Sequence, residues 1–234
     1  MKKFVLLLAI ALFGLNASSA QNFEWRHMNS AIMAFAQLPG SPNTVFAGDV
    51  AGLIRRSDDK GATWKIVSMQ AESQILDIAF LNATTGFATT AEWGLVLKTV
   101  NGGKTWNRIH LVSNDNGQVQ SVRGTHRIVV VDESTAFFDI FNHPISAPSG
   151  KAGIVTRDGG LTFKSDTTPG EVYHVSGSTL LAFGREVMQF GLSKFTVYKS
   201  TDKGLSWNIV KTSPAGLSNT FDNNGIELAH FLNE

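Results

Sequence analysis

The residues that could carry out acid–base chemistry in this chain are few. Two carboxylic acids facing each other across a groove can hydrolyse a glycosidic bond, one as general acid and the other as base or nucleophile. Asp49 and Glu92 are the candidates for such a pair, because each follows the second strand-like run of a repeat. Acidic side chains in loops are most often simply solvated, and we favour that interpretation for both residues.

Metal, nucleotide and other cofactor sites are not indicated by the sequence. The six histidines show no pair at metal-ligand spacing, and the lack of cysteine excludes thiolate ligands, disulfides and a lipid-modified cysteine. Residues 114–117 (Asn-Asp-Asn-Gly) resemble the start of a calcium loop, but no acidic residue follows at the required distance. No glycine-rich loop precedes a helix that would hold a phosphate. We therefore expect no metal and no cofactor.

The composition is that of a globular protein without a bias toward a polyanionic partner. Of the 234 residues, 43% are hydrophobic and 17% are charged, which excludes a disordered chain. Lys and Arg number 20 and Asp and Glu number 19, which gives a net charge of +1. A nucleic-acid-binding domain would be distinctly basic, so we expect no nucleic-acid partner.

The first twenty residues have the pattern of a secretory signal peptide. Lys2 and Lys3 precede an apolar run over residues 4–15, and small residues follow up to Ala20, where cleavage is expected. A bilayer-spanning helix needs about 20 apolar residues, so the run is too short for a membrane anchor. No later apolar stretch approaches that length. We expect a secreted or periplasmic protein with no membrane span after cleavage.

An internal repeat organises the remaining residues. Four segments share the pattern Ser/Thr-x-Asp/Asn-x-Gly-x-Thr/Ser-aromatic, and we call them the repeated turns: residues 57–64, 99–106, 156–163 and 200–207. Their aromatic residues are 42, 57 and 44 positions apart. Periods of this size predict the blades of a β-propeller, with about four strands each. Val, Ile, Phe and Thr dominate the runs between the turns, as β-strands prefer.

The residue types of the pattern are those of a tight hairpin turn. An Asp or Asn side chain can hydrogen-bond the backbone two residues on, and Gly supplies a positive φ. One or two acids per turn are too few for a calcium loop, so we expect a structural role. The turn aromatics, such as Trp64 and Trp207, are expected to be buried against a neighbouring blade. The residues concerned are Ser57, Asp59, Gly61, Trp64, Thr99, Asn101, Gly103, Trp106, Thr156, Asp158, Gly160, Phe163, Ser200, Asp202, Gly204 and Trp207.

The four repeated turns resemble Asp-boxes, the signature of BNR/Asp-box propellers. The sequences at 80–88 and 97–106 are most similar to the photosystem II stability/assembly factor group, which is related to sortilins and sialidases. Asn101 in place of Asp and Phe163 in place of Trp are mild departures from the motif. The resemblance implies an all-β propeller of four-stranded antiparallel blades, with each repeated turn between the third and fourth strands.

The ends of the repeats predict a partial propeller. Residues 226–233 resemble 75–82, the first strand of a blade, so we expect four blades and, at 225–234, the first strand of a fifth. Residues 24–28 resemble a fourth strand. The expected domain spans 21–234, after the signal peptide at 1–20, and its blades cover about 31–68, 74–112, 126–166 and 171–211.

The resemblance leaves more than one function open. A sialidase would need an arginine cluster and a tyrosine nucleophile, but Tyr173 and Tyr198 both lie inside predicted strands and the Phe/Tyr-Arg-Ile-Pro motif is absent. We favour a non-enzymatic binding or assembly propeller. The alternative is a glycoside hydrolase of sialidase or xyloglucanase type with catalytic acids partly in further blades. A purely structural or adhesive repeat is a third interpretation.

Two insertions locate the expected binding surface. Residues 113–125 and 142–152 account for the wide spacing around the third blade, and both should emerge opposite the repeated turns. Loops on a rigid scaffold often carry binding residues, although both insertions could equally be neutral surface loops. The partner would be a protein or a glycan. The expected binding residues are Glu92, Trp93, Arg123, His126, His143, Lys151, Arg185 and Glu186.

Overall fold

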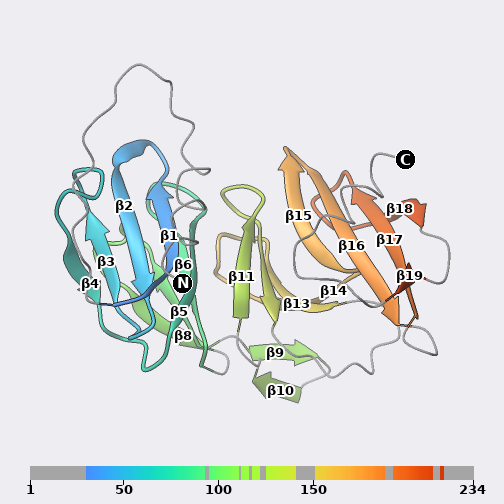
Figure 1. Ribbon diagram of the computed structural model, residues 1–234, viewed down its shortest axis with the longest axis horizontal. Coiled ribbons are helices and arrows are strands. Elements are labelled where there is room, and N and C mark those ends of the chain that lie inside the picture. The colour runs from blue at the N-terminus through green and yellow to red at the C-terminus, as the bar shows by residue number, and fades with distance from the viewer. Residues whose placement is uncertain are drawn as a thin grey trace.

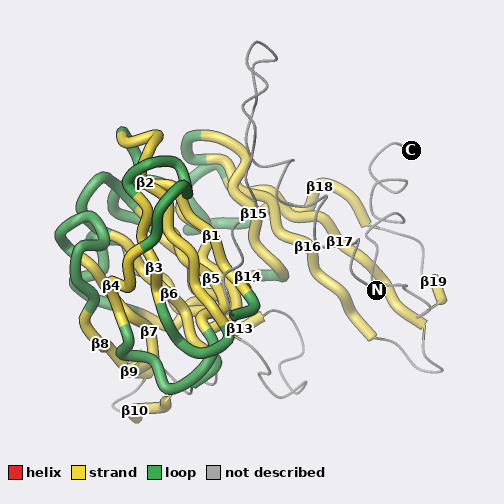
Figure 2. Tube along the Cα trace, turned by 60° about the vertical axis from the view of Figure 1, so that its left-hand side comes forward, coloured by secondary structure: helices red, strands yellow, loops and turns green. Residues whose placement is uncertain are grey.

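A computed structural model gives the architecture of the chain. The described residues are 30–92, 95–110, 112–115, 118–121, 125–140, 151–187, 192–212 and 217–218, and among them are strands and turns but no helix (Figure 2). The predicted signal peptide at 1–20 and the predicted strand at 225–234 lie outside the described residues. Nothing in the described part of the chain forms an apolar helix of bilayer-spanning length.

The strands form four antiparallel sheets in chain order, which we call blades one to four. Blade one contains β1 (Ile32–Leu38), β2 (Ser41–Asp49), β3 (Ile54–Ser57) and β4 (Lys65–Ser68). Blade two contains β5 (Ile75–Phe80), β6 (Gly86–Thr90), β7 (Leu95–Thr99) and β8 (Asn107–His110). Blade three contains β11 (Thr125–Val130), β12 (Ala136–Ile140), β13 (Lys151–Thr156) and β14 (Lys164–Thr168). Blade four contains β15 (Glu171–Ser176), β16 (Thr179–Val187), β17 (Leu192–Ser200) and β18 (Asn208–Thr212).

The blades are arranged as an open arc, with blade one at one end and blade four at the other (Figure 1). The predicted propeller architecture of four-stranded antiparallel blades is therefore confirmed. Each repeated turn connects the third and fourth strands of its blade, as predicted. The insertion after blade two contains a hairpin of β9 (Val112–Asp115) and β10 (Gln118–Ser121). The sequence predicts a loop for this insertion. Blade four gains a short fifth strand, β19 (Leu217–Ser218), which pairs with β17.

The hydrophobic core lies between successive blades. Side chains alternate along each strand, so one set of apolar residues packs on the preceding blade and the other on the following one. Between blades one and two, Phe46 packs against Phe80 and Trp106, with ring centroids 4.8 and 6.2 Å away. Between blades two and three, the ring of Phe87 meets that of Phe138 at 5.2 Å. Blade contacts of this kind replace the single central core of a compact domain.

The repeated turns are held by their own side chains. In the first turn, Ser57 Oγ accepts a hydrogen bond from Gly61 N at 2.7 Å and donates one to Asp59 Oδ1 at 2.6 Å. The Asp59 carboxylate also accepts from Thr63 N and Thr63 Oγ1, at 2.8 and 2.6 Å. Hydrogen bonds from Ser57 and Thr63 lower the pKa of Asp59 to about 2. The turns in the other three blades repeat the Ser/Thr to Gly bond at 2.7–2.9 Å.

A second contact joins the repeated turns of blades two, three and four to the blade before each of them. Arg56 Nη1 donates to the Gly102 carbonyl of blade two at 2.7 Å, and its guanidinium lies 5.6 Å from the Phe46 ring centroid. Lys98 of blade two makes a similar contact one residue further along the turn, donating to the Gly160 carbonyl of blade three at 2.7 Å. Arg157 of blade three reaches the Lys203 carbonyl of blade four, at 2.9 Å. We call this repeated arrangement the blade latch. In it, a cationic side chain lies above a phenylalanine ring of its own blade and donates a hydrogen bond to the repeated turn of the next blade.

The tryptophans of the turns differ in burial, which corrects one expectation. Trp64 and Trp207 were expected to be buried, but both are half-exposed, whereas Trp106 is 2% exposed. Trp106 packs toward blade one, between Phe46 and Phe80. Trp64 belongs to the first described blade and covers only its own turn, close to Gly61. A preceding blade is not sufficient to bury the aromatic residue, since Phe163 and Trp207 also have one and are only partly buried. Trp106 is buried because the rings of Phe46 and Phe80 enclose it.

Candidate functional site

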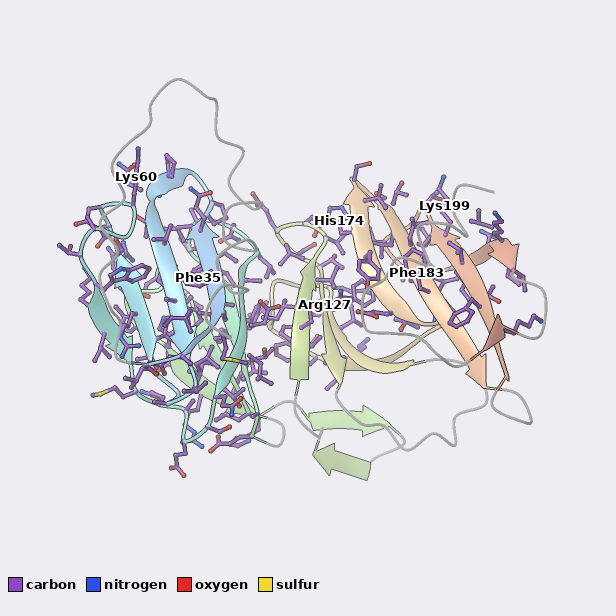
Figure 3. The ribbon with its side chains drawn as sticks, in the orientation of Figure 1. Phe35, Lys60, Arg127, His174, Phe183 and Lys199 are labelled. Carbon is purple, nitrogen blue, oxygen red and sulfur yellow. The ribbon has the colours of Figure 1, made fainter. Side chains whose placement is uncertain are left out.

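The strand ends beside both insertions meet at one end of blade three. Thr125 pairs with Ile140, and Lys151 opens β13 next to the end of β12. The repeated turn at 156–163 lies at the opposite end of the same strands. In Figure 3, Lys60 of the first turn and the β9–β10 hairpin likewise lie on opposite sides of the molecule. We call the side opposite the repeated turns the loop face.

The structure places five of the eight predicted binding residues at strand ends on this side. His126 lies in β11, Lys151 in β13, and Arg185 and Glu186 near the end of β16, while Glu92 follows β6. The remaining three, Trp93, Arg123 and His143, lie outside the described residues. Residues 142–150 of the second insertion also lie outside them, so the composition of a joint site on the loop face stays a prediction.

Glu92 is held by a neighbouring arginine. Arg108 Nη2 of β8 donates to Glu92 Oε2 at 3.4 Å, and Arg108 Nη1 donates to the Gln70 carbonyl at 3.0 Å. Glu72 Oε1 lies 3.7 Å from the same guanidinium. The Glu92 backbone N–H also bonds Thr90 Oγ1 at 3.2 Å. Glu92 is therefore half-buried and ion-paired rather than a fully solvated loop carboxylate.

Asp49 is not a groove carboxylate or an ordinary loop residue, which corrects both interpretations of it. Asp49 is fully buried, and its Oδ1 accepts hydrogen bonds from the backbone N–H groups of Ala51 and Leu53, each at 2.9 Å. Its Oδ2 accepts from the guanidinium of Arg55. Burial alone would raise the pKa of Asp49, but the bonds from Arg55, Leu53 and Ser30 bring it below the usual value. Asp49 holds the β2–β3 turn and stays ionised, so it is unsuited to act as a general acid.

The first strands of blades two, three and four each carry a charged residue at the same position, which the sequence pattern alone does not reveal. Asp77 of β5, Arg127 of β11 and Glu171 of β15 occupy equivalent places, opposite Thr89, Asp139 and Phe183 in their respective ladders. Asp77 Oδ2 accepts a hydrogen bond from the backbone N–H of Ile128 at 2.8 Å, which links blades two and three. The alternation of acid, base and acid becomes visible only once the strand register is known.

Arg127 makes the corresponding link between blades three and four. Its Nη2 donates to the Val172 carbonyl at 2.6 Å, and its Nη1 lies 3.1 Å from Glu171 Oε1. The guanidinium also lies 4.5 Å from the ring centroid of Tyr173, which meets Phe183 edge-on. Burial raises the pKa of Tyr173, so its hydroxyl stays protonated at neutral pH.

Together these side chains form a mixed aromatic and charged surface on blades three and four. Tyr173 is 39% exposed, and the side chains of Arg127 and Glu171 are 28% and 38% exposed. Such a surface can offer apolar contact together with hydrogen bonds, as protein interfaces do. Figure 3 shows Arg127 on β11 in the middle of the arc and His174 near the opposite end of β15 from the loop face.

Comparisons with known proteins identify related sequences and folds. A family model described as Photosynthesis system II assembly factor YCF48 matches residues 56–131. Photosystem II assembly lipoprotein Ycf48 of Synechococcus sp. (strain CC9902) is 24% identical over 159 residues. This match covers 65% of the chain and 41% of the relative, so the chain spans about two fifths of that protein.

Two solved structures are similar in fold. An ancestral GH74 enzyme aligns with a TM-score of 0.52 and 20% identity, over 76% of this chain and 25% of the enzyme. YCF48 from Cyanidioschyzon merolae aligns with a TM-score of 0.47 and 16% identity, over 79% of this chain and 57% of that one. At this identity the GH74 likeness shows a shared propeller fold and nothing about activity.

Proposed function

We propose that this chain, a photosystem II assembly factor-like BNR propeller, is a non-enzymatic protein-binding module that acts outside the cytoplasm. The family match over residues 56–131 supports this proposal, because it runs from β3 through all of blade two into blade three. The curated relative is named as an assembly lipoprotein, which agrees with an extracytoplasmic protein that binds other proteins.

The proposal that the protein is not an enzyme rests on the ionisation of its carboxyl groups. In the described chain, every carboxyl group with a clearly changed pKa has a lowered one: Asp49, Asp58, Asp59, Asp132, Asp158 and Asp202. Each is held ionised by hydrogen bonds or by a cation. A glycoside hydrolase needs a carboxylic acid that stays protonated until it donates its proton, which requires a raised pKa. These six carboxylates are arranged to accept hydrogen bonds.

The proposed binding surface is the loop face together with its neighbouring inner strands. The loop face would contribute the predicted residues Glu92, Trp93, Arg123, His126, His143, Lys151, Arg185 and Glu186. A tryptophan in a loop, as predicted for Trp93, would be well suited to anchor a peptide segment, and Arg123 would pair with acidic groups of the partner. We propose a protein partner, since the family match favours assembly, and retain a glycan as the alternative.

The test is a binding measurement with matched variants. The purified chain is immobilised and exposed to an extracytoplasmic extract from its source, and recovered proteins are identified by mass spectrometry. Trp93→Ala and Arg123→Glu should abolish recovery of a specific protein that the parent chain captures, with unchanged thermal unfolding. Leu161→Asp is the control, because Leu161 lies in a repeated turn on the other side and is 81% exposed.

The hydrolase alternative needs its own assay. The same preparation is incubated with xyloglucan and with a sialoside, and released sugars are measured. Turnover that is lost in Glu92→Gln would contradict the non-enzymatic proposal. Recovery of the same proteins by the parent chain and by both loop-face variants would contradict the proposed surface. Mass spectrometry of the exported protein tests the localisation, because cleavage after Ala20 leaves Gln21 at the N-terminus.

A further inference from the structure

The second repeated turn departs from the other three at its acidic position. Asn101 stands where the other turns have Asp59, Asp158 and Asp202, and Gly102 follows it directly. Asparagine is a chemically labile residue, and it loses its amide group most readily before a glycine, which has no Cβ to hinder the attack of its backbone nitrogen. The turn therefore contains a labile pair of residues inside a structural motif.

Deamidation of this pair proceeds through a cyclic imide. The Gly102 nitrogen attacks Cγ of Asn101, a bond forms between these two atoms, and the bond from Cγ to Nδ2 breaks. The proton of the attacking nitrogen leaves with the amide group as ammonia. Water then opens the ring in one of two ways. Cleavage of the new bond between nitrogen and Cγ gives aspartate, whereas cleavage of the original peptide bond gives isoaspartate, in which the backbone runs through the side chain.

The folded turn keeps the two reacting groups apart. Asn101 Oδ1 accepts hydrogen bonds from Thr99 Oγ1 and from the backbone N–H of Thr105, each at 3.0 Å. Asn101 Nδ2 donates to Thr105 Oγ1 at 2.8 Å. The N–H of Gly102 donates instead to the carbonyl of Thr84, at 2.8 Å. The carboxamide and the attacking nitrogen are thus held by different partners, so the turn must open before they can react.

Blade one opposes the opening of this turn. Arg56 Nη1 donates to the Gly102 carbonyl at 2.7 Å, which is the first blade latch. Gly102 and Gly103 are both buried, and Gly103 lies against the ring of Phe46. The backbone around the labile pair is therefore held by the interface between blades one and two.

The two products differ in how well they fit the turn. In the other three turns, the aspartate accepts a hydrogen bond from the Thr or Ser hydroxyl four residues on, at 2.5–2.6 Å. Thr105 places the same hydroxyl beside position 101, so an aspartate there restores the motif. An isoaspartate lengthens the backbone by one methylene. Gly103 already lies so close to Phe46 that an added Cβ would clash, and a close-packed interface does not absorb such a shift.

We propose that Asn101 is a deamidation site that the interface between blades one and two keeps closed, so that modification at this position reports opening of that interface. The rate of conversion in the folded protein is then the rate in the unfolded chain multiplied by the fraction of time for which the turn is open. Because the loss of ammonia is irreversible, modified chains accumulate as the interface opens repeatedly. One product retains the turn, and the other leaves a weakened interface.

Peptide mass spectrometry during incubation in a mildly alkaline buffer tests the proposal. Asn116 and Asn224 also precede a glycine and serve as references in the unfolded chain. In guanidinium chloride, Asn101 should convert at a rate similar to theirs. In the folded protein, Asn101 should convert at least about tenfold more slowly than in the unfolded chain, as expected for a site that requires local opening. Equal rates in the folded and unfolded chain, or no conversion in the unfolded chain, would overturn the proposal.

Two matched arginine variants separate opening of this interface from a general loosening of the fold. Arg56→Ala removes the hydrogen bond to Gly102. It should speed the conversion of Asn101 about tenfold, the factor by which losing one hydrogen bond from a charged group shifts an opening equilibrium. Arg157→Ala removes the corresponding bond between blades three and four and should leave the rate at Asn101 unchanged. Arg56→Lys, which keeps a cation as in the second blade latch, should give an intermediate rate.

Far-UV circular dichroism and thermal unfolding show which variants are folded at the incubation temperature, and only folded variants are compared. Equal rates in Arg56→Ala and Arg157→Ala would overturn the role of the interface. If Arg56→Ala does not fold, Arg56→Lys takes its place, and a rate no faster than that of the parent chain would overturn that role as well. Asn101→Asp reproduces one product and should melt no lower than the parent chain. A clearly lower melting temperature would contradict the fit of an aspartate at this position.

Discussion

Gly103 of blade two lies directly against the ring of Phe46 in blade one. A Cβ built at position 103 would be 2.3 Å from Phe46 Cε1 and 2.4 Å from Cζ, closer than any real contact. The backbone at Gly103 also has a φ of 74°. Glycine is therefore required here for two reasons, the local turn conformation and the approach of the neighbouring blade. The repeated turn is in this sense a docking element as well as a hairpin.

Gly103→Ala should destabilise the protein more than Gly40→Ala. Gly40 has the same φ of 74°, but nothing lies within 4 Å of a Cβ there. Both variants carry the left-handed penalty of about 1–2 kcal/mol. Gly103→Ala adds an overpacking cost of about 1–3 kcal/mol. Urea unfolding of the two variants measures the difference directly, and equal losses of unfolding free energy would show that the blade contact contributes nothing.

Trp106→Ala should cost much more than Trp64→Ala. Trp106 is almost fully buried between two phenylalanine rings, and removing a buried large aromatic costs about 3–5 kcal/mol. Trp64 is only partly buried, so its removal should cost clearly less. The free energy of unfolding of both variants is measured by urea denaturation. A larger loss for Trp64→Ala would contradict the difference in burial.

The protein should lose stability as the pH falls from about 4 toward 2. Asp59 and Asp158 each have a folded-state pKa of about 2, below the value of about 3.9 in an unfolded chain. Their hydrogen bonds therefore stabilise the fold above pH 4 and are lost as the carboxylates become protonated. Asn101 at the same place in blade two does not titrate. Asp59→Asn should make the pH dependence of the melting temperature shallower in this window, and an unchanged slope would be inconsistent with the lowered pKa.

Arg127→Ala should be more damaging than Glu171→Gln. Loss of Arg127 removes its bond to the Val172 carbonyl and its contact with Tyr173, and a hydrogen bond from a charged group is worth about 1.5–3 kcal/mol. Glu171→Gln removes only a partly exposed ion pair, worth about 1 kcal/mol or less. Thermal unfolding of both variants tests this ranking. Equal losses of stability would mean that the ion pair with Glu171, and not the hydrogen bond to the Val172 carbonyl, accounts for the contribution of Arg127.

The fold was predictable because its signal is local and occurs four times. Each repeated turn contains, within eight residues, the groups that close it, as Ser57 and Asp59 show. The burial of the turn aromatic was not predictable in the same way. Trp64 and Trp106 have the same local sequence context, but Trp106 lies between the rings of Phe46 and Phe80, which come from two different blades.

The candidate site was predictable only in outline. The loop face follows from counting strands and insertions, and the strand ends near Thr125, Ile140 and Lys151 lie together as that counting requires. Arg127 could not be found by searching loops, because its partners come from a different blade. The structural role of Asp49 could not be predicted, because its carboxylate accepts hydrogen bonds from Arg55 and from two backbone N–H groups only in the folded β2–β3 turn.

Asp49→Asn should reduce stability and leave any binding on the loop face intact once the protein is folded. The substitution leaves Arg55, whose side chain is 16% exposed, without its anionic partner. It also replaces a charged acceptor of two backbone N–H groups by a neutral one. Breaking a buried ion pair by removing one partner costs several kcal/mol, and we expect about 3 kcal/mol here because Arg55 retains some contact with water. Glu92→Gln is the control, since Glu92 lies two residues after Thr90, the blade-two counterpart of Asp49, and is ion-paired nearer the surface. Its loss should cost about 1 kcal/mol or less. Urea unfolding followed by tryptophan fluorescence separates the two variants. A stable Asp49→Asn protein that had lost a hydrolytic activity would instead indicate that the carboxylate takes part in chemistry.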